Sequence, residues 1–246
     1  RRHAAGDAMT AAEWNAPYSH VSVTPNKASR ARRAAAAKAV SRWLSADRPV
    51  AAWVTVCAAL SPALLTIAWL IGDAVQPASY SPVRQTVSVL AGYGATDRWI
   101  VTGAVYVIGV CHLATAAGMP VLTLRARVGL VVAGLAAIGI AASPQPATGS
   151  SAPHLVFTCI GAAAITLWPA LAAQRRASAS IFVSARVSAV VFVGFLILLA
   201  WTVVETQDGG SLGLAERVSS AIQIGWPLAV AVSLRRGTSR AAVNLA

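Results

Sequence analysis

Charged residues are scarce in this chain of 246 residues. They make up 11% of the sequence, whereas hydrophobic residues make up 57%, and a soluble domain carries about 25% charged residues. The few charges gather in short segments between long apolar runs. This distribution is typical of a polytopic membrane protein and argues against a soluble globular domain.

Acidic residues are scarcer than basic ones. The sequence has 8 Asp and Glu against 20 Lys and Arg, which gives a formal net charge of +12. Such a charge can indicate nucleic-acid binding, but here the basic residues lie before residue 50 or beside the apolar runs. Basic flanks are expected next to membrane spans, where they bind anionic lipid at the cytoplasmic face. We therefore expect membrane lipids as partners, and no nucleic acid.

Cysteines and recognisable catalytic motifs are also few or lacking. Cys57, Cys111 and Cys159 each lie alone inside an apolar run, without the close spacing of metal sites or disulfide frameworks. The sequence has no H-E-x-x-H, no G-x-x-x-x-G-K-[ST] and no G-x-G-x-x-G after a strand. We therefore expect no metal and no cofactor.

What the sequence does contain is six apolar runs. At a rise of 1.5 Å per residue, about 20 residues suffice to cross a hydrocarbon core about 30 Å thick. We therefore predict an all-α fold, a membrane domain of six transmembrane helices over 49–236. The predicted spans are 50–71, 99–119, 121–142, 153–172, 182–204 and 218–234.

The segments that flank this domain are polar. Residues 1–25 are predicted to be a disordered tail, and 237–246 a cytoplasmic tail. The basic, Ala-rich stretch over 26–48 is predicted to be a cytoplasmic helix beside the membrane, because Ala favours helix and the Arg side chains suit anionic headgroups.

The basic residues also predict the orientation. With the N-terminus inside, the inner segments hold seventeen Lys and Arg and the outer loops hold three. This bias places both termini in the cytoplasm. Lys occurs at only two positions and Ala is abundant, which favours a bacterial protein of the cytoplasmic membrane.

The loop between the first two spans contains a predicted short amphipathic helix, Pro82–Ala91. Ser81 is a suitable N-cap, and Pro82 suits the first helical position. Val83, Val87 and Leu90 recur on one face of this helix. We expect it to rest on the outer end of the bundle.

Three stretches resemble a known family. They are 81–103 (SPVRQTVSVLAGYGATDRWIVTG), His154 at the start of a later helix, and Gly213, Leu214, Glu216 and Arg217 before the last one. Together they are similar to a bacterial and archaeal membrane family named domain of unknown function 998. The resemblance covers about residues 50–236. It implies the topology and a functional face, without implying a reaction.

Polar residues near the outer ends of the spans are the candidate binding site. His154 and Thr158 share one helix face, as do Glu216 and Gln223 on the last span. These stripes predict a polar cavity open to the outer face. Glu205 lies near the outer end of the fifth span, and the rim of the cavity would hold charged groups, namely Arg84, Asp73, Asp97, Arg98 and Arg217. His112 is a separate candidate, because a titratable side chain at membrane depth is costly.

Several functions fit these residues. The first is a non-enzymatic protein that binds a lipid or amphiphile, with Arg84 or Arg98 holding an anionic group, or a subunit of an envelope complex with membrane-protein partners. The alternative is an outer-face hydrolase acting on lipid, in which His154, Glu205 and Glu216 would bind a metal ion. The charged residues also fit a purely structural role as ion pairs that fix the loops.

Overall fold

The computed structural model describes residues 28, 31–36, 50–149, 151–174 and 180–243. The chain divides into two compact units, Arg1–Trp43 and Leu44–Ala246. In the first unit, residues 31–36 are helical. The tail predicted over 1–25 lies outside the described residues, as does most of the helix predicted over 26–48.

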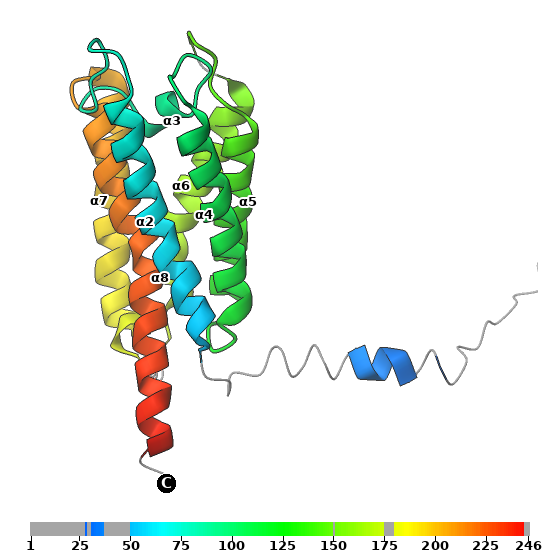
Figure 1. The fold of residues 1–246 in the computed structure, drawn as a ribbon. Helices are drawn as coiled ribbons and strands as arrows, with labels where there is room; N and C mark the ends of the chain where they lie inside the picture. The colour runs from blue at the N-terminus through cyan, green and yellow to red at the C-terminus, as the bar shows by residue number, and fades with distance from the viewer. Residues whose placement is uncertain (1–27, 29–30, 37–49, 150, 175–179, 244–246) are drawn as a thin grey trace, which may run out of the picture. The chain divides into compact units, whose positions relative to one another are not determined.

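Six long helices form a closed ring in the second unit (Figure 1). Each contacts the next, and the last contacts the first. In chain order they are α2 (Ala52–Ala74), α4 (Trp99–Gly118), α5 (Leu124–Ala142), α6 (Ala152–Ala172), α7 (Ala185–Asp208) and α8 (Leu212–Val243). The short helix α3 (Val87–Leu90) contacts α2 and α8. The end of the ring that carries α3, with the loop residues 75–98, 143–149, 151 and 209–211, is called the α3 end.

Five of the six predicted spans are confirmed as helices long and apolar enough to cross a membrane: α2, α4, α5, α6 and α7. Large apolar side chains point outward from these helices. Leu70 of α2, Leu135 of α5 and Ile197 of α7 are each more than half exposed. Apolar exposure on this scale suits a lipid environment and not water. The protein is therefore a multi-pass membrane protein.

The sixth predicted span lies within α8, which is not among those five helices. The reason is that α8 carries polar side chains on the face that points into the ring. Ser219 and Gln223 are 7% and 4% exposed, whereas Leu214 and Ile222 are the large apolar residues that α8 exposes. The helix also continues to Val243, so the start of the predicted C-terminal tail extends α8.

Local signals set several helix ends. The side chain of Thr123 accepts from the N–H of Ala126 at the start of α5, and Ser151 accepts from the N–H of His154 at the start of α6. Helix α7 ends at Gly209, whose φ of +68° is the left-handed conformation that glycine adopts without strain.

Small and aromatic residues pack the helices together. Gly109 of α4 and Gly134 of α5 face each other so closely that a Cβ on Gly109 would lie 2.7 Å from the carbonyl oxygen of Gly134. Trp168 of α6 is fully buried, and its indole N–H donates to the carbonyl of Ala126 at 2.9 Å. These contacts hold α4, α5 and α6 as one wall of the ring.

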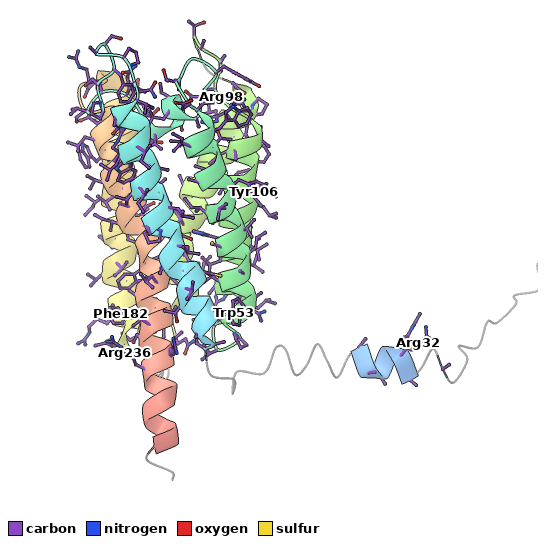
Figure 2. All side chains as sticks on the ribbon, viewed as in Figure 1. Arg32, Trp53, Arg98, Tyr106, Phe182 and Arg236 are labelled. Carbon is purple, nitrogen blue, oxygen red and sulfur yellow. The ribbon has the colours of Figure 1, made fainter. Side chains whose placement is uncertain are left out.

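Labelled side chains mark the two ends of the ring. Figure 2 shows Trp53, Phe182 and Arg236 at the end opposite Arg98. Tyr106 points outward from α4 and is 52% exposed (Figure 2).

The loop helix is shorter than Pro82–Ala91, so that prediction is wrong in its bounds. Only Val87–Leu90 is helical, and Thr86 is its N-cap instead of Ser81. The preceding residues form a turn in which the Ser81 carbonyl accepts from the N–H of Gln85 at 2.8 Å. The helix is short because of contacts with α8, which is distant in sequence. Carbonyls of this turn accept hydrogen bonds from α8 and are therefore not available to a helix.

Candidate functional site

The start of α8 holds the 75–98 loop, which contains α3, through four residues that we call the α8 clamp: Gly213, Leu214, Glu216 and Arg217. Gly213 allows the loop to lie close to α8, because a Cβ at this position would overlap the carbonyl oxygens of Gln85 and Pro82. The N–H of Leu214 donates to the carbonyl of Val83 at 3.0 Å. The loop backbone therefore lies directly against the first turn of α8.

Arg217 makes most of the hydrogen bonds in the clamp. It is 7% exposed. Its Nη1 donates to the carbonyls of Pro82 at 2.7 Å and Gln85 at 2.8 Å. Its Nη2 forms an ion pair with Asp73 of α2 at 2.7 Å and donates to the Tyr80 hydroxyl at 2.6 Å. One buried guanidinium thus joins α2, the loop and α8.

Tyr80 completes this group as a neutral donor. Its hydroxyl donates to Asp73 at 2.8 Å. Burial raises the pKa of Tyr80 to about 12, and the hydrogen bond to Asp73 adds to the effect. The phenol therefore keeps its proton at neutral pH, and it donates to the same Asp73 oxygen, Oδ1, that Arg217 contacts.

Glu216 points to α3 and not to Asp73 or its partners. Its carboxylate accepts from the N–H of Val87 at 2.7 Å and from the Ser88 hydroxyl at 3.4 Å. Val87 is the first residue of α3, so the carboxylate satisfies an N–H that has no partner within the helix. The clamp therefore fixes both the turn over 82–85 and the start of α3.

A cavity of about 210 Å³ lies inside the ring, between α4, α5, α6, α7 and α8. An adjoining cavity of about 140 Å³ shares part of this lining and reaches α2 and α3. Most of the lining is apolar, with Ala137 and Ile140 of α5 common to both parts. The polar lining residues are His112, Thr158, Thr202, Glu216, Ser219, Ser220 and Gln223.

This cavity brings together four of the predicted site residues: Thr158, Glu216, Gln223 and His112. They come from α4, α6 and α8, which are far apart in sequence. The α8 stripe of Glu216 and Gln223 faces inward, as its spacing indicates, and His112 joins it from α4. The structure therefore places the candidate intramembrane histidine and the outer polar stripe at one site.

His112 presents a hydrogen-bond acceptor to the cavity. Its Nδ1 lies 3.0 Å from the carbonyl oxygen of Ile108 and 3.3 Å from the Ser61 hydroxyl. A carbonyl can only accept, so the proton of the neutral ring is assigned to Nδ1 and Nε2 carries a lone pair. In the described part of the chain, Nε2 receives no hydrogen bond.

Two further cavity residues have unused hydrogen-bonding capacity. The amide Nε2 of Gln223 donates to the carbonyl of Phe195 at 3.3 Å, which leaves its oxygen as an acceptor. The Thr158 hydroxyl is buried and has no partner among the described residues. Buried polar atoms are normally satisfied, so these atoms are candidate ligand contacts.

His154 and Glu205 lie elsewhere and do not line either part of the cavity. His154 is 3% exposed, and its Nδ1 donates to the carbonyl of Ser143 in the α5–α6 loop at 2.8 Å. Glu205 accepts from the N–H of Ser211 at 2.7 Å and from the Trp201 indole at 3.3 Å. Both side chains therefore fix connections between helices.

Of the predicted rim residues, Arg84, Asp97 and Arg98 lie at the surface of the α3 end, whereas Arg217 is buried in the α8 clamp. Arg84 and Asp97 are exposed. Arg98 stacks on the Trp99 ring, 3.7 Å from its centroid, and on Tyr93 at 4.7 Å. None of these charged residues lines the cavity. The lining contains no Lys or Arg, so an anionic group inside the cavity would meet no cation.

The predicted metal ligands do not come together. Among the described residues, no group of three or more His, Cys, Asp and Glu side chains could hold a metal ion. Glu216 lines the cavity while His154 and Glu205 hold loops. The donor set for the metal-dependent hydrolase therefore has no support in the geometry.

Sequence reasoning does not single out two residues that the structure makes prominent. Ser219 lines the cavity and lies three residues after Glu216, so its helical spacing could have identified it. Tyr80 joins the clamp through Asp73 and Arg217. It carries no local signal, because its partners lie on α2 and α8.

The ring, the clamp and the cavity define a helical multi-pass membrane protein with a partly polar internal cavity. The chain belongs to the family described as Protein of unknown function (DUF998), which matches residues 59–233. The match confirms the resemblance and covers the cavity-lining residues, α3 and the α8 clamp. Neither the curated proteins nor the solved structures gave a match to this chain.

Proposed function

We propose that α8 is a sixth membrane span and that the α3 end faces outward in the bacterial cytoplasmic membrane, with both chain termini in the cytoplasm. The basic residues support this orientation, because Arg125, Arg186, Arg235 and Arg236 belong to the loops and helix ends opposite α3. That end would contact anionic lipid at the cytoplasmic face. The polar face of α8 is compatible with a span because it points into the ring.

Cysteine labelling tests the orientation. In intact bacteria that express a cysteine-free background, a membrane-impermeant maleimide is expected to label Thr148→Cys, an exposed residue at the α3 end. Ala185→Cys, at the opposite end, should be labelled only after the membrane is opened. The reverse pattern would show that the α3 end is cytoplasmic.

We further propose that this protein binds an amphiphile without chemical conversion, either by itself or as a subunit of an envelope complex. The observation that carries the proposal is the cavity inside the ring, whose wall is apolar apart from inward-facing polar groups. Binding pockets combine an apolar lining with a few polar groups that fix orientation. An amphiphile, with an apolar body and one polar end, matches this lining.

Filling the cavity tests the binding proposal. In nanodiscs, a diazirine-bearing octanol is expected to label peptides of α5, α6 and α8 that line the cavity. Ala137→Phe places a ring in the cavity and should remove this labelling. Leu135→Phe is the matched control, because Leu135 lies on the same helix and faces outward. Labelling confined to outward-facing residues, and equal in both variants, would contradict an internal binding site.

A further inference from the structure

Glu216 is a carboxylate that forms no ion pair among the described residues. The neighbouring Arg217 turns away from it and pairs with Asp73 at 2.7 Å, the single ion pair found among the described residues. Glu216 accepts instead from two neutral groups, the N–H of Val87 and the Ser88 hydroxyl. Since a carboxylate has about four lone-pair sites, it retains capacity for a further donor.

This carboxylate lines both parts of the cavity. A charge beside an apolar wall loses hydration, and the loss is costly unless a charge or hydrogen bonds compensate for it. The hydrogen bonds from Val87 and Ser88 compensate for part of this loss, but no Lys or Arg of the described chain lines the cavity to add a positive charge. A bound cation would supply it.

The other free polar atoms of the lining disfavour an anionic ligand. Nε2 of His112 and the amide oxygen of Gln223 are acceptors, and the Thr158 hydroxyl is unpartnered. An ammonium group carries three donors and no acceptor. A carboxylate or phosphate would instead face Glu216 and these lone pairs.

The size of the cavity restricts the apolar part. Its two parts have volumes of about 210 Å³ and about 140 Å³, which place it near the lower end of the range of about 300–1,000 Å³ that is usual for pockets of drug-sized ligands. A short alkyl body suits this space, whereas the two acyl chains of a whole phospholipid exceed it.

We propose that the cavity binds a cationic amphiphile, namely a protonated amine on a short apolar body, with Glu216 as its counter-ion. This inference rests on the proposed amphiphile-binding function and specifies its ligand. The ammonium group lies at Glu216, and the alkyl body extends along the apolar wall of α5 and α6.

The test uses three probes of equal chain length, which are octylammonium, octanol and octanoate. Each competes with diazirine-octanol for labelling of the full chain in nanodiscs of zwitterionic lipid, so that lipid charge does not attract the amine. Octylammonium is expected to protect the cavity from labelling at a concentration about tenfold below that of octanol. The reason is that a hydrogen bond between charged groups contributes more binding free energy than a neutral one. Octanoate is expected not to protect.

Two isosteric variants assign the effect to one carboxylate. Glu216→Gln keeps an acceptor for the N–H of Val87, and it should abolish the preference for octylammonium while octanol still protects. Asp208→Asn removes an equal charge from an exposed position near the same end and should change nothing. If Glu216→Gln does not fold, the inference is tested by the order in which the three probes protect the unaltered chain from labelling.

Different outcomes would contradict the cationic ligand alone or both proposals. Equal protection by octanol and octylammonium, lost in Ala137→Phe, would overturn the cationic ligand and leave amphiphile binding intact. A preference for the amine that persists in Glu216→Gln would place the cation elsewhere and overturn this inference. Absence of protection by any probe would overturn both proposals.

Discussion

Replacement of Arg217 by alanine is expected to destabilise the protein by about 3–5 kcal/mol, the usual cost of removing one partner from a buried ion pair. In detergent, the apparent Tm should fall by about 10 °C or more. The substitution leaves the Asp73 carboxylate without its cation and the carbonyls of Pro82 and Gln85 without their donor.

The matched control for this prediction is Arg84→Ala. Arg84 has the same charge, lies in the same loop and is exposed, so its loss should leave the apparent Tm nearly unchanged. Arg217→Lys should recover only part of the stability, because an ammonium cannot reproduce the forked donation to two carbonyls and a carboxylate. An Arg217→Ala protein as stable as Arg84→Ala would show that the clamp does not hold the loop.

Gly213→Ala is expected to lower stability by about 3 kcal/mol, at the upper end of the usual cost of overpacking. The added methyl group would overlap the carbonyl oxygens of Pro82 and Gln85, which are backbone atoms and cannot rotate away. The loop must therefore move from α8 and lose hydrogen bonds to Arg217. Thermal unfolding in detergent and proteolysis of the 75–98 loop would both report this displacement.

Gly225→Ala is the control for this second prediction. Gly225 lies in the same helix, and a Cβ there would have nothing within 4 Å. Alanine favours helix over glycine by about 1 kcal/mol, so this variant should be equal to or more stable than the unaltered protein. Equal losses in both variants would indicate a general sensitivity of α8 and not a contact with the loop.

The helical framework could be predicted from the sequence because its signal is local. A run such as Ala52–Ala74 is predominantly apolar, and its length and composition identify a candidate span. The limits of α3 could not be predicted. They depend on Arg217, which is more than 130 residues from Pro82 in the chain and takes the carbonyls that a longer helix would need.

The candidate site was predictable only along single helices. The spacing of Glu216 and Gln223 predicts that both share one face of the last helix, and both line the cavity. The same reasoning paired His154 with Thr158, yet only Thr158 lines the cavity, because His154 binds the Ser143 carbonyl beyond the helix end. Helical periodicity does not indicate which helices are neighbours, so it could not join His112 to this group.

The closed ring has a consequence for how the protein is assembled during synthesis. Helix α8 follows all the other ring helices in the chain, and it carries the polar face. When α8 leaves the ribosome, the acceptors that it needs, such as the Pro82 and Phe195 carbonyls, have already been made. In the proposed six-span topology, the least apolar helix therefore enters the membrane after its polar partners have been made, and its arrival closes the ring between α7 and α2.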